Sequence, residues 1–270
     1  NLLMIVVLGI IIMQYLLHIR KYQQCTNDMV IQIKGIFIAI LIVIVSMVII
    51  SFTPVEYINY IYLFSYLAFL IYPTFMTKKM KYRYMNFPHL VERMQLITIL
   101  TVGELVIAVI KTYPLAEHFL LSVSTFVMVG FLFVSYISQT VIGIEHHQER
   151  AGGPLVYLHI GILIAINIIT AGEMYYDGQL LEMGSSMVLV GITLFYICLF
   201  GTSRYNKEGL QMTKELARNY FIVYLIGMFL AFLFKTNTPI FFGILAIQSV
   251  VMTRVAFRSR RDWVRDNIQF

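Results

Sequence analysis

The sequence alternates between long apolar blocks and short polar connections. Nine blocks approach the roughly 20 residues that a helix needs to cross the hydrocarbon core of a bilayer. These blocks cover about 1–17, 35–51, 57–76, 89–110, 118–142, 154–174, 184–201, 219–234 and 239–256. Their apolar runs are continuous rather than alternating, which favours helices over the strands of a membrane barrel. We therefore expect an all-α, polytopic transmembrane helical bundle of about nine spans, formed by residues 1–256.

The composition agrees with a membrane environment. Of the 270 residues, 59% are hydrophobic and 13% are charged, which is too little charge to cover the surface of a soluble domain. The net charge of +6 is spread over the connections between apolar blocks, so it indicates membrane topology and not nucleic-acid binding. The two cysteines, Cys25 and Cys198, lie in different surroundings and predict no disulfide framework.

The basic residues alternate strictly between successive connections, and positive charge concentrates on the cytoplasmic side of membrane proteins. Only Lys111 and Lys235 lie in the even-numbered connections. Seventeen lie in the odd-numbered connections and the tail: Arg20, Lys21, Lys34, Lys78, Lys79, Lys81, Arg83, Arg150, Arg204, Lys207, Lys214, Arg218, Arg254, Arg258, Arg260, Arg261 and Arg265. We therefore predict that the odd connections and a basic tail of residues 257–270 lie in the cytoplasm.

The fourth block carries an unusual set of polar residues: His89, Glu92, Arg93, Gly103 and Glu104. Ionisable groups inside a membrane are costly and commonly face a partner or a hydrated path. With a rise of 1.5 Å and a turn of 100° per residue, Arg93 and Glu104 lie nearly in line but about 16 Å apart. They are too distant to pair, so we expect each to meet a partner on another helix. Glu104 is the first candidate for a functional group.

The sixth block carries the candidate partners His159, Asn167 and Glu173. His159 lies in its cytoplasmic half and Glu173 towards its outer end, within about 40° of one helical face. Glycines precede both glutamates, at Gly103 and Gly172, and glycine lets a helix or a ligand approach closely. The alternative is structural: these residues are interhelical struts, snorkelling side chains or wet helix ends.

The two Gly-Glu pairs also indicate a weak parallel repeat. Each pair is followed by a block with a similar stretch, Met128-Val129-Gly130 and Leu189-Val190-Gly191. Both pairs of blocks would run from the cytoplasm to the outside and back, as in transporters built from parallel repeats. Chance similarity between apolar helices explains the match equally well, so both explanations stay open.

The fourth block resembles a known family. Its pattern His89-x-x-Glu92-Arg93, followed by Gly103-Glu104, is similar to the hallmark of the bacterial low-temperature-requirement A (LtrA) family. The segment from His159 to Glu173 resembles the second motif of that family more loosely, since the usual proline after the histidine is replaced and the spacing to the acid differs by one. The resemblance implies a multi-pass protein of the bacterial cell membrane, associated by name with growth in the cold.

That family usually has an N-terminal acidic-aromatic segment, which this sequence lacks. The chain starts with Asn1, directly in an apolar block. We therefore expect it to be the retained part of a longer protein. The acids of the family segment would then contribute to any complete site.

The C-terminal tail combines arginines with the only tryptophan, at Arg258, Arg260, Arg261, Trp263 and Arg265. Basic side chains near a membrane attract anionic lipids, at about 1 kcal/mol each, and tryptophan favours the interface. We therefore predict that the tail contacts anionic lipid.

The segment 145–150 superficially offers metal ligands in Glu145, His146 and His147. Metal sites need several ligands at defined spacings, and the sequence has no matching cluster elsewhere. It also has no phosphate-binding glycine loop, nucleophile elbow or His-Glu-x-x-His motif. We expect a solvated loop, no metal and no cofactor.

Three functional hypotheses remain. A transporter or channel-like protein would move a small solute or ion, coupled to protons, between the fourth and sixth spans, with Glu104 as the proton- or cation-binding group and Arg93 and His159 near the cytoplasmic mouth. A membrane-embedded enzyme would hold the phosphate of a lipid or isoprenoid with His89, Glu92 and Arg93. A membrane-adaptation protein would use these residues only structurally. The spread of charges through the membrane depth favours transport, since enzymes more often gather them at one depth.

Overall fold

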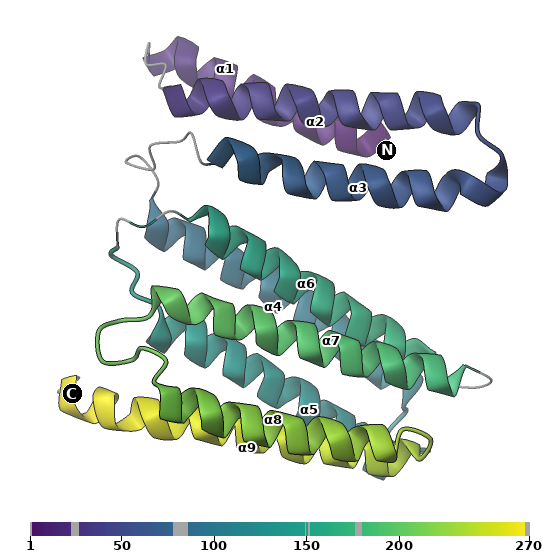
Figure 1. Cartoon of the computed structure of the whole chain (residues 1–270), viewed down its shortest axis with the longest axis vertical. Coiled ribbons are helices and arrows are strands. Elements are labelled where there is room, and N and C mark those ends of the chain that lie inside the picture. Colours follow the sequence, from purple (N-terminus) through teal and green to yellow (C-terminus); the bar gives the residue numbers. More distant parts are fainter. Residues whose placement is uncertain are drawn as a thin grey trace. The chain divides into compact units, whose positions relative to one another are not determined.

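The structure is a computed structural model that describes residues 2–22, 27–77, 86–148, 150, 152–175 and 180–267. Within these ranges the chain forms nine α-helices, and each coincides with one of the nine apolar blocks. They are α1 (Leu2–Tyr22), α2 (Asn27–Ser51), α3 (Val55–Thr77), α4 (Phe87–Thr112), α5 (Phe119–Ile137), α6 (Gly153–Met174), α7 (Leu181–Gly201), α8 (Lys214–Leu233) and α9 (Thr238–Asn267) (Figure 1). The all-α fold is therefore confirmed.

Seven of the helices in the described residues are long and apolar enough to cross a membrane, namely α2 and α4 to α9. A bilayer core admits a chain only when the backbone satisfies its own hydrogen bonds, as these helices do. The chain is thus a multi-pass helical membrane protein in a lipid bilayer. Spanning by α1 and α3 stays a prediction.

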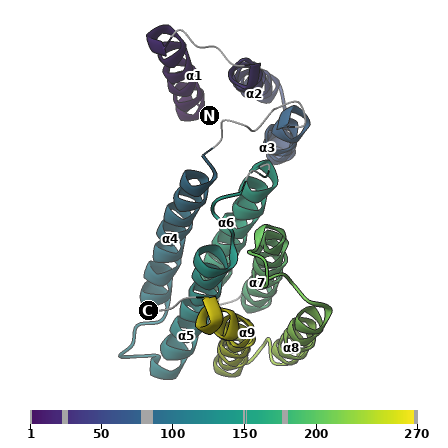
Figure 2. The same cartoon turned by 90° about the vertical axis from the view of Figure 1, so that its left-hand side faces the viewer.

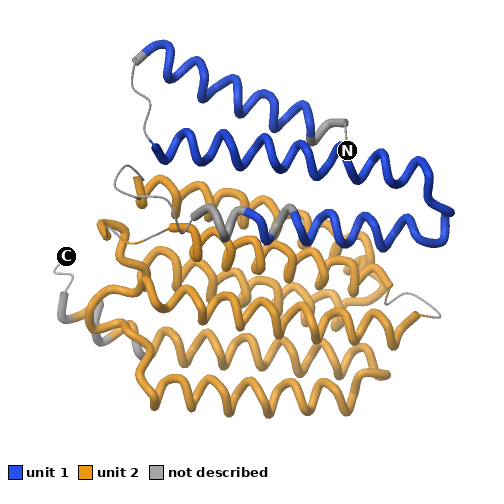
Figure 3. The backbone as a smooth tube through the Cα atoms, turned by 45° about the horizontal axis from the view of Figure 1, so that its top comes forward, with its two compact units in different colours: residues 1–85 blue, residues 86–270 orange. Residues whose placement is uncertain are grey.

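The helices divide into two compact units, residues 1–85 and residues 86–270, coloured blue and orange in Figure 3. In unit 1, α2 packs against both α1 and α3. The hydroxyl of Tyr15 in α1 donates to the side-chain oxygen of Gln32 in α2. A tight turn joins α2 to α3, with the amide of Phe52 donating to the carbonyl of Ile49 at 3.1 Å.

Unit 2 contains α4 to α9, and its helices run alternately in opposite directions (Figure 1). The most extensive pairing joins α6 to α7, while α5 packs against both α4 and α9 (Figure 2). Its core is apolar and includes the fully buried Leu105, Ile162, Phe195 and Phe241. In a membrane such a core is held by close packing, because lipid is as apolar as the side chains themselves.

Glycines allow the close approach of α6 and α7. A Cβ added at Gly191 would lie 2.9 Å from the backbone oxygen of Ala165 and 3.1 Å from the backbone nitrogen of Ile169. A Cβ at Gly172 would lie 2.8 Å from the backbone oxygen of Gly184. Small residues at such contacts are the common device for helix association in membranes.

The ends of the helices follow local sequence signals. The side chain of Asn86 caps α4 by accepting from the amide of His89, and a proline follows in the first turn, where its missing N–H leaves no bond unmade. Pro239 lies in the first turn of α9, as its position in the sequence predicts. Helix α9 continues to Asn267, so the described part of the basic tail prolongs the last helix.

Unit 2 places its basic connections at one end. The start of α4, the connections 144–152 and 202–213 and the C-terminal part of α9 lie there (Figure 1), and we call this the basic end. Lys111 and Lys235 lie at the opposite end. The positive-inside rule therefore predicts that the basic end faces the cytoplasm.

Paired cysteine substitutions test this sidedness. In a chain lacking Cys25 and Cys198, we expect Glu117→Cys to react with a membrane-impermeant maleimide in intact cells. Glu208→Cys should react only after the membrane is opened. Both glutamates are exposed, so their access to the reagent is matched. The reverse labelling pattern would contradict the predicted topology.

Candidate functional site

The polar residues of α4 lie on its exposed surface in unit 2. His89, Glu92, Arg93, Gly103 and Glu104 are all exposed. The Nδ1 atom of His89 and the Oε2 atom of Glu92 are 3.1 Å apart, one helical turn from each other. Nothing described lies within 4 Å of a Cβ added at Gly103. These residues therefore share a face of α4 without enclosing a site in unit 2.

The polar residues of α6 are divided between the interior and the surface. His159 and Glu173 are both fully buried, at 0% exposure. Asn167 is exposed, and its amide donates to the carbonyl of Leu163 on its own helix at 2.8 Å. Of the residues expected to line a polar path, the structure thus brings two into the core of unit 2, and both come from α6.

Glu173 is a carboxylate enclosed among helices. Neither of its carboxylate oxygens has a hydrogen-bond partner among the described residues. Its backbone oxygen accepts a long hydrogen bond from the hydroxyl of Tyr113, at 3.4 Å. The neighbouring Gly172 packs directly against α7, so Glu173 lies beside a close contact between two helices.

His159 is oriented by one hydrogen bond. Its Nδ1–H donates to the carbonyl of Leu155 at 2.9 Å, which leaves Nε2 as the acceptor nitrogen of a neutral ring. Nε2 is buried and has no partner among the described residues, and neither has the hydroxyl of Tyr136. The two rings pack edge to face at 5.8 Å. Two buried polar atoms are therefore left open for a ligand, a proton or water.

A single path between α4 and α6 would require Glu104, Arg93 and His159 to face a common cavity. The cavity between α5, α7, α8 and α9 is lined by none of Glu104, Arg93 and His159. Glu104 and Arg93 lie on the surface of α4, whereas His159 lies inside. The expected grouping of the three around one path therefore does not appear within unit 2.

A second polar cluster, at the basic end, was not expected from the sequence. It begins where α5 ends and the chain widens into a π-helical turn, Ser138–Gly143. Such turns often occur at functional sites. Here the turn presents Ser138 and Gln139 to the interior, where both are buried. The guanidinium of Arg260 in α9 donates to the hydroxyl of Ser138 and to the side-chain oxygen of Gln139.

The cluster continues into the connection after α7. Gln139 donates through Nε2 to Oδ1 of Asn206 at 2.6 Å, and Asn206 donates to the carbonyl of Leu210 at 2.7 Å. The backbones of Gly143 and Lys207 are also joined, by a hydrogen bond of 2.9 Å. A Cβ at Gly143 would lie 3.0 Å from Oε1 of Gln139, so the glycine makes room for this network.

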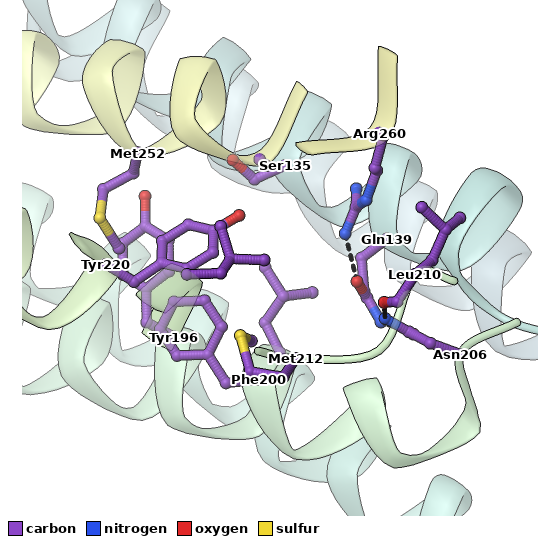
Figure 4. A pocket seen from close by; sticks show the side chains of 13 residues that line it. Ser135, Gln139, Tyr196, Phe200, Asn206, Leu210, Met212, Tyr220, Met252 and Arg260 are labelled. Carbon is purple, nitrogen blue, oxygen red and sulfur yellow. Dashed lines mark hydrogen bonds between the residues drawn. The ribbon is translucent and has the colours of Figure 1, made fainter. Parts of the chain in front are cut away.

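A cavity of about 30 Å³ adjoins the network, which is room for about two water molecules. Figure 4 shows Arg260 pointing to Gln139, with Tyr196 and Tyr220 on the other side of the cavity. Burial lowers the pKa of the Arg260 guanidinium, yet arginine remains charged at neutral pH.

The tail arginines take different positions from one another. Arg258, Arg261 and Arg265 are exposed, in keeping with the predicted contact with anionic lipid. Arg260 is only 9% exposed, which differs from the expected position at the lipid surface. The side chain of Trp263 lies outside the described residues.

A sequence signal for the burial of Arg260 does exist. Ser249, Thr253, Ala256 and Arg260 recur at intervals of three or four residues and are all buried. Such spacing marks one helical face, and Thr253 is hydrogen-bonded to Ser135 of α5 at 2.6 Å. Small residues on that face let α9 approach α5 closely. Because Arg260 lies on the same face, it is buried at this contact as well.

The described residues contain no group of three or more histidine, cysteine or acidic side chains that could hold a metal ion. In the segment 145–150, His146 shares a hydrogen bond of 2.9 Å with the carbonyl of Thr140. Glu145 accepts from the amide of His147 at 3.0 Å. These side chains therefore organise the loop itself.

Comparison with known proteins gives one match. The sequence profile of a family described as bacterial low temperature requirement A protein (LtrA) matches residues 1–257. No curated protein and no solved structure shows a significant match.

Proposed function

The chain belongs to the bacterial low temperature requirement A (LtrA) family, and on that premise we propose that it moves a small solute or ion, coupled to protons, across the bacterial cell membrane. The path runs along α6, inside unit 2, where His159 and Glu173 are buried. Glu173 is the group that binds and releases the proton or cation. Glu104, on the exposed surface of α4, is a second ionisable group of the proposed path.

The free carboxylate of Glu173 carries this proposal. An isolated carboxylate inside a protein is strongly disfavoured, so it takes up a proton, a cation or a hydrogen-bond donor. Neither oxygen has such a donor among the described residues. A structural strut needs a partner in place, whereas a carrier group is vacant for part of its cycle. The isolation of the carboxylate therefore supports transport over a purely structural role.

His159 supports the same proposal from a different depth. It lies fourteen residues before Glu173 on the same helix, or about 21 Å along its axis. Its unpartnered Nε2 is the nitrogen that can accept a proton and return it. Two buried ionisable groups, one in each half of α6, suit the stepwise movement of a proton or cation.

The enzyme hypothesis has less support. It assigns headgroup binding to His89, Glu92 and Arg93, which lie on the exposed surface of α4. None of them lines the cavity between α5, α7, α8 and α9. An enclosed site normally buries most of its ligand, and no such enclosure surrounds these residues in unit 2.

The proposal is tested by reconstituting the purified chain into liposomes with an imposed pH gradient. Potassium with valinomycin compensates the charge that the moving protons carry. Inorganic ions and amino acids are present on both sides of the membrane as possible solutes. A pH-sensitive dye inside the liposomes reports the proton flux. We expect the gradient to collapse at least tenfold faster than in protein-free liposomes. Equal rates would contradict the proposed function.

The same assay determines whether α4 takes part. We expect Glu104→Gln to lower the flux at least tenfold without loss of insertion, because an ionisable group within a spanning helix is rarely kept without a role. Glu117→Gln, in the connection after α4, is the matched control and should retain full flux. Full activity of Glu104→Gln would remove α4 from the path and leave α6 as its carrier.

A further inference from the structure

The guanidinium of Arg260 brings a positive charge into the interior of the basic end. Its partners, the hydroxyl of Ser138 and the side-chain amide of Gln139, are both neutral. No ion pair joins it to a carboxylate among the described residues. A buried charge is strongly disfavoured unless a charge of opposite sign compensates it. Among the described residues, the site therefore lacks a negative charge.

Several side chains that line the cavity beside Arg260 carry hydrogen-bond donors, and none of the described lining side chains is acidic. The hydroxyl of Tyr196 is buried there, close to Ser135, and makes no hydrogen bond of normal geometry to the described residues. The guanidinium has five N–H donors, more than its two bonds employ. Figure 4 shows Phe200 and Met252 completing the wall with apolar surface. Unused donors beside an uncompensated positive charge are the features of an anion site.

We propose that this cavity binds a small inorganic anion of halide size, held by the Arg260 guanidinium and the Tyr196 hydroxyl. The volume of about 30 Å³ accommodates such an ion, since one water-sized sphere needs about 10–15 Å³ by the same measure. Lipid headgroups are too large for it. Water alone would satisfy the hydroxyl but would leave the charge uncompensated. The site goes beyond the proposed transport, and it holds its anion whether or not Glu173 carries protons.

The surroundings favour an anion as well. Exposed Arg258 and Arg261 lie on the same helix as Arg260, and Arg204 and Lys207 lie in the connection that carries Asn206. A concentration of like charges at one end of a protein raises the local concentration of counter-ions. The cavity thus lies at the end of unit 2 that attracts anions.

The test uses the full purified chain in detergent. Sodium gluconate is replaced stepwise by sodium chloride or bromide at constant ionic strength, and the midpoint of thermal unfolding is followed. A ligand that binds only the folded state raises this midpoint in a saturable way. We expect a rise of several degrees with either halide. Gluconate serves as the anion too large to enter.

Variants of the two proposed ligands sharpen the test. Tyr196→Phe should raise the halide concentration that gives half of the maximal rise in the unfolding midpoint about threefold to tenfold, because the variant loses one hydrogen bond to the ion. Tyr136→Phe is its matched control, since that hydroxyl is also buried without a partner but does not line the cavity. Arg260→Gln should abolish the saturable effect, whereas Arg258→Gln, an exposed neighbour, should leave it intact.

Equal effects of halides and gluconate would overturn the proposal, and so would a larger saturable effect of sulfate. An unchanged halide dependence in Tyr196→Phe would also overturn it, even if Arg260→Gln fails to fold. Proton flux is not measured in any of these experiments, so their outcome is independent of the transport assay.

Discussion

Glu173→Gln abolishes proton-coupled flux while the protein still inserts and folds; this is the expected result for a carrier carboxylate. Glutamine has nearly the same shape as glutamate but neither binds nor releases a proton. Removing an ionisable group from a fully buried position also removes the penalty for burying its charge. We therefore expect at least a tenfold loss of flux in liposomes and a thermal midpoint that is unchanged or higher.

The control for this experiment is Glu182→Gln. Glu182 lies at the start of α7, at the same end of unit 2, but is exposed and 3.6 Å from Lys235. An exposed ion pair contributes little to stability, so both flux and thermal midpoint should stay close to those of the unsubstituted chain. Undiminished flux in Glu173→Gln would contradict the carrier role. A large fall in its thermal midpoint would indicate a structural carboxylate instead.

The helices were predictable from the sequence for a simple physical reason. Each crossing of a bilayer demands about 20 apolar residues, and polar connections interrupt these blocks clearly. The expected block 154–174 and the observed α6, Gly153–Met174, differ by one residue. The expected block 118–142 ends in a π-helical turn instead of a regular α-helix, because a widened turn leaves no trace in hydropathy.

The site was less predictable, because a helical wheel shows which residues share a face but not what that face meets. Gly103-Glu104 and Gly172-Glu173 have the same sequence, yet Glu104 is exposed and Glu173 is buried. The difference comes from packing, since α6 lies directly against α7. Arg260 is a second example, because its burial depends on contacts with Ser138 and Gln139 in the π-helical turn after α5, more than a hundred residues away in the sequence.

The contact between α6 and α7 leads to the second large effect. Gly191→Ala is expected to destabilise the protein by about 1–3 kcal/mol, the range for overpacking a tight interior. The new methyl group would meet backbone atoms of α6 at Ala165 and Ile169. Backbone atoms cannot relieve the clash by changing rotamer as a side chain can, so α6 and α7 must move apart. The measurement is thermal unfolding in detergent, where the midpoint should fall by several degrees.

Gly130→Ala in α5 provides the matched control for Gly191→Ala. Nothing described lies within 4 Å of a Cβ added at Gly130, and alanine favours a helix over glycine by about 1 kcal/mol. Its thermal midpoint should therefore stay constant or rise. Gly172 of α6, the neighbour of Glu173, packs against α7, the helix that carries Gly191. Separating α6 from α7 should therefore also open the surroundings of the Glu173 carboxylate and slow proton flux. Equal midpoints for Gly191→Ala and Gly130→Ala would show that this glycine contact does not hold the two helices together.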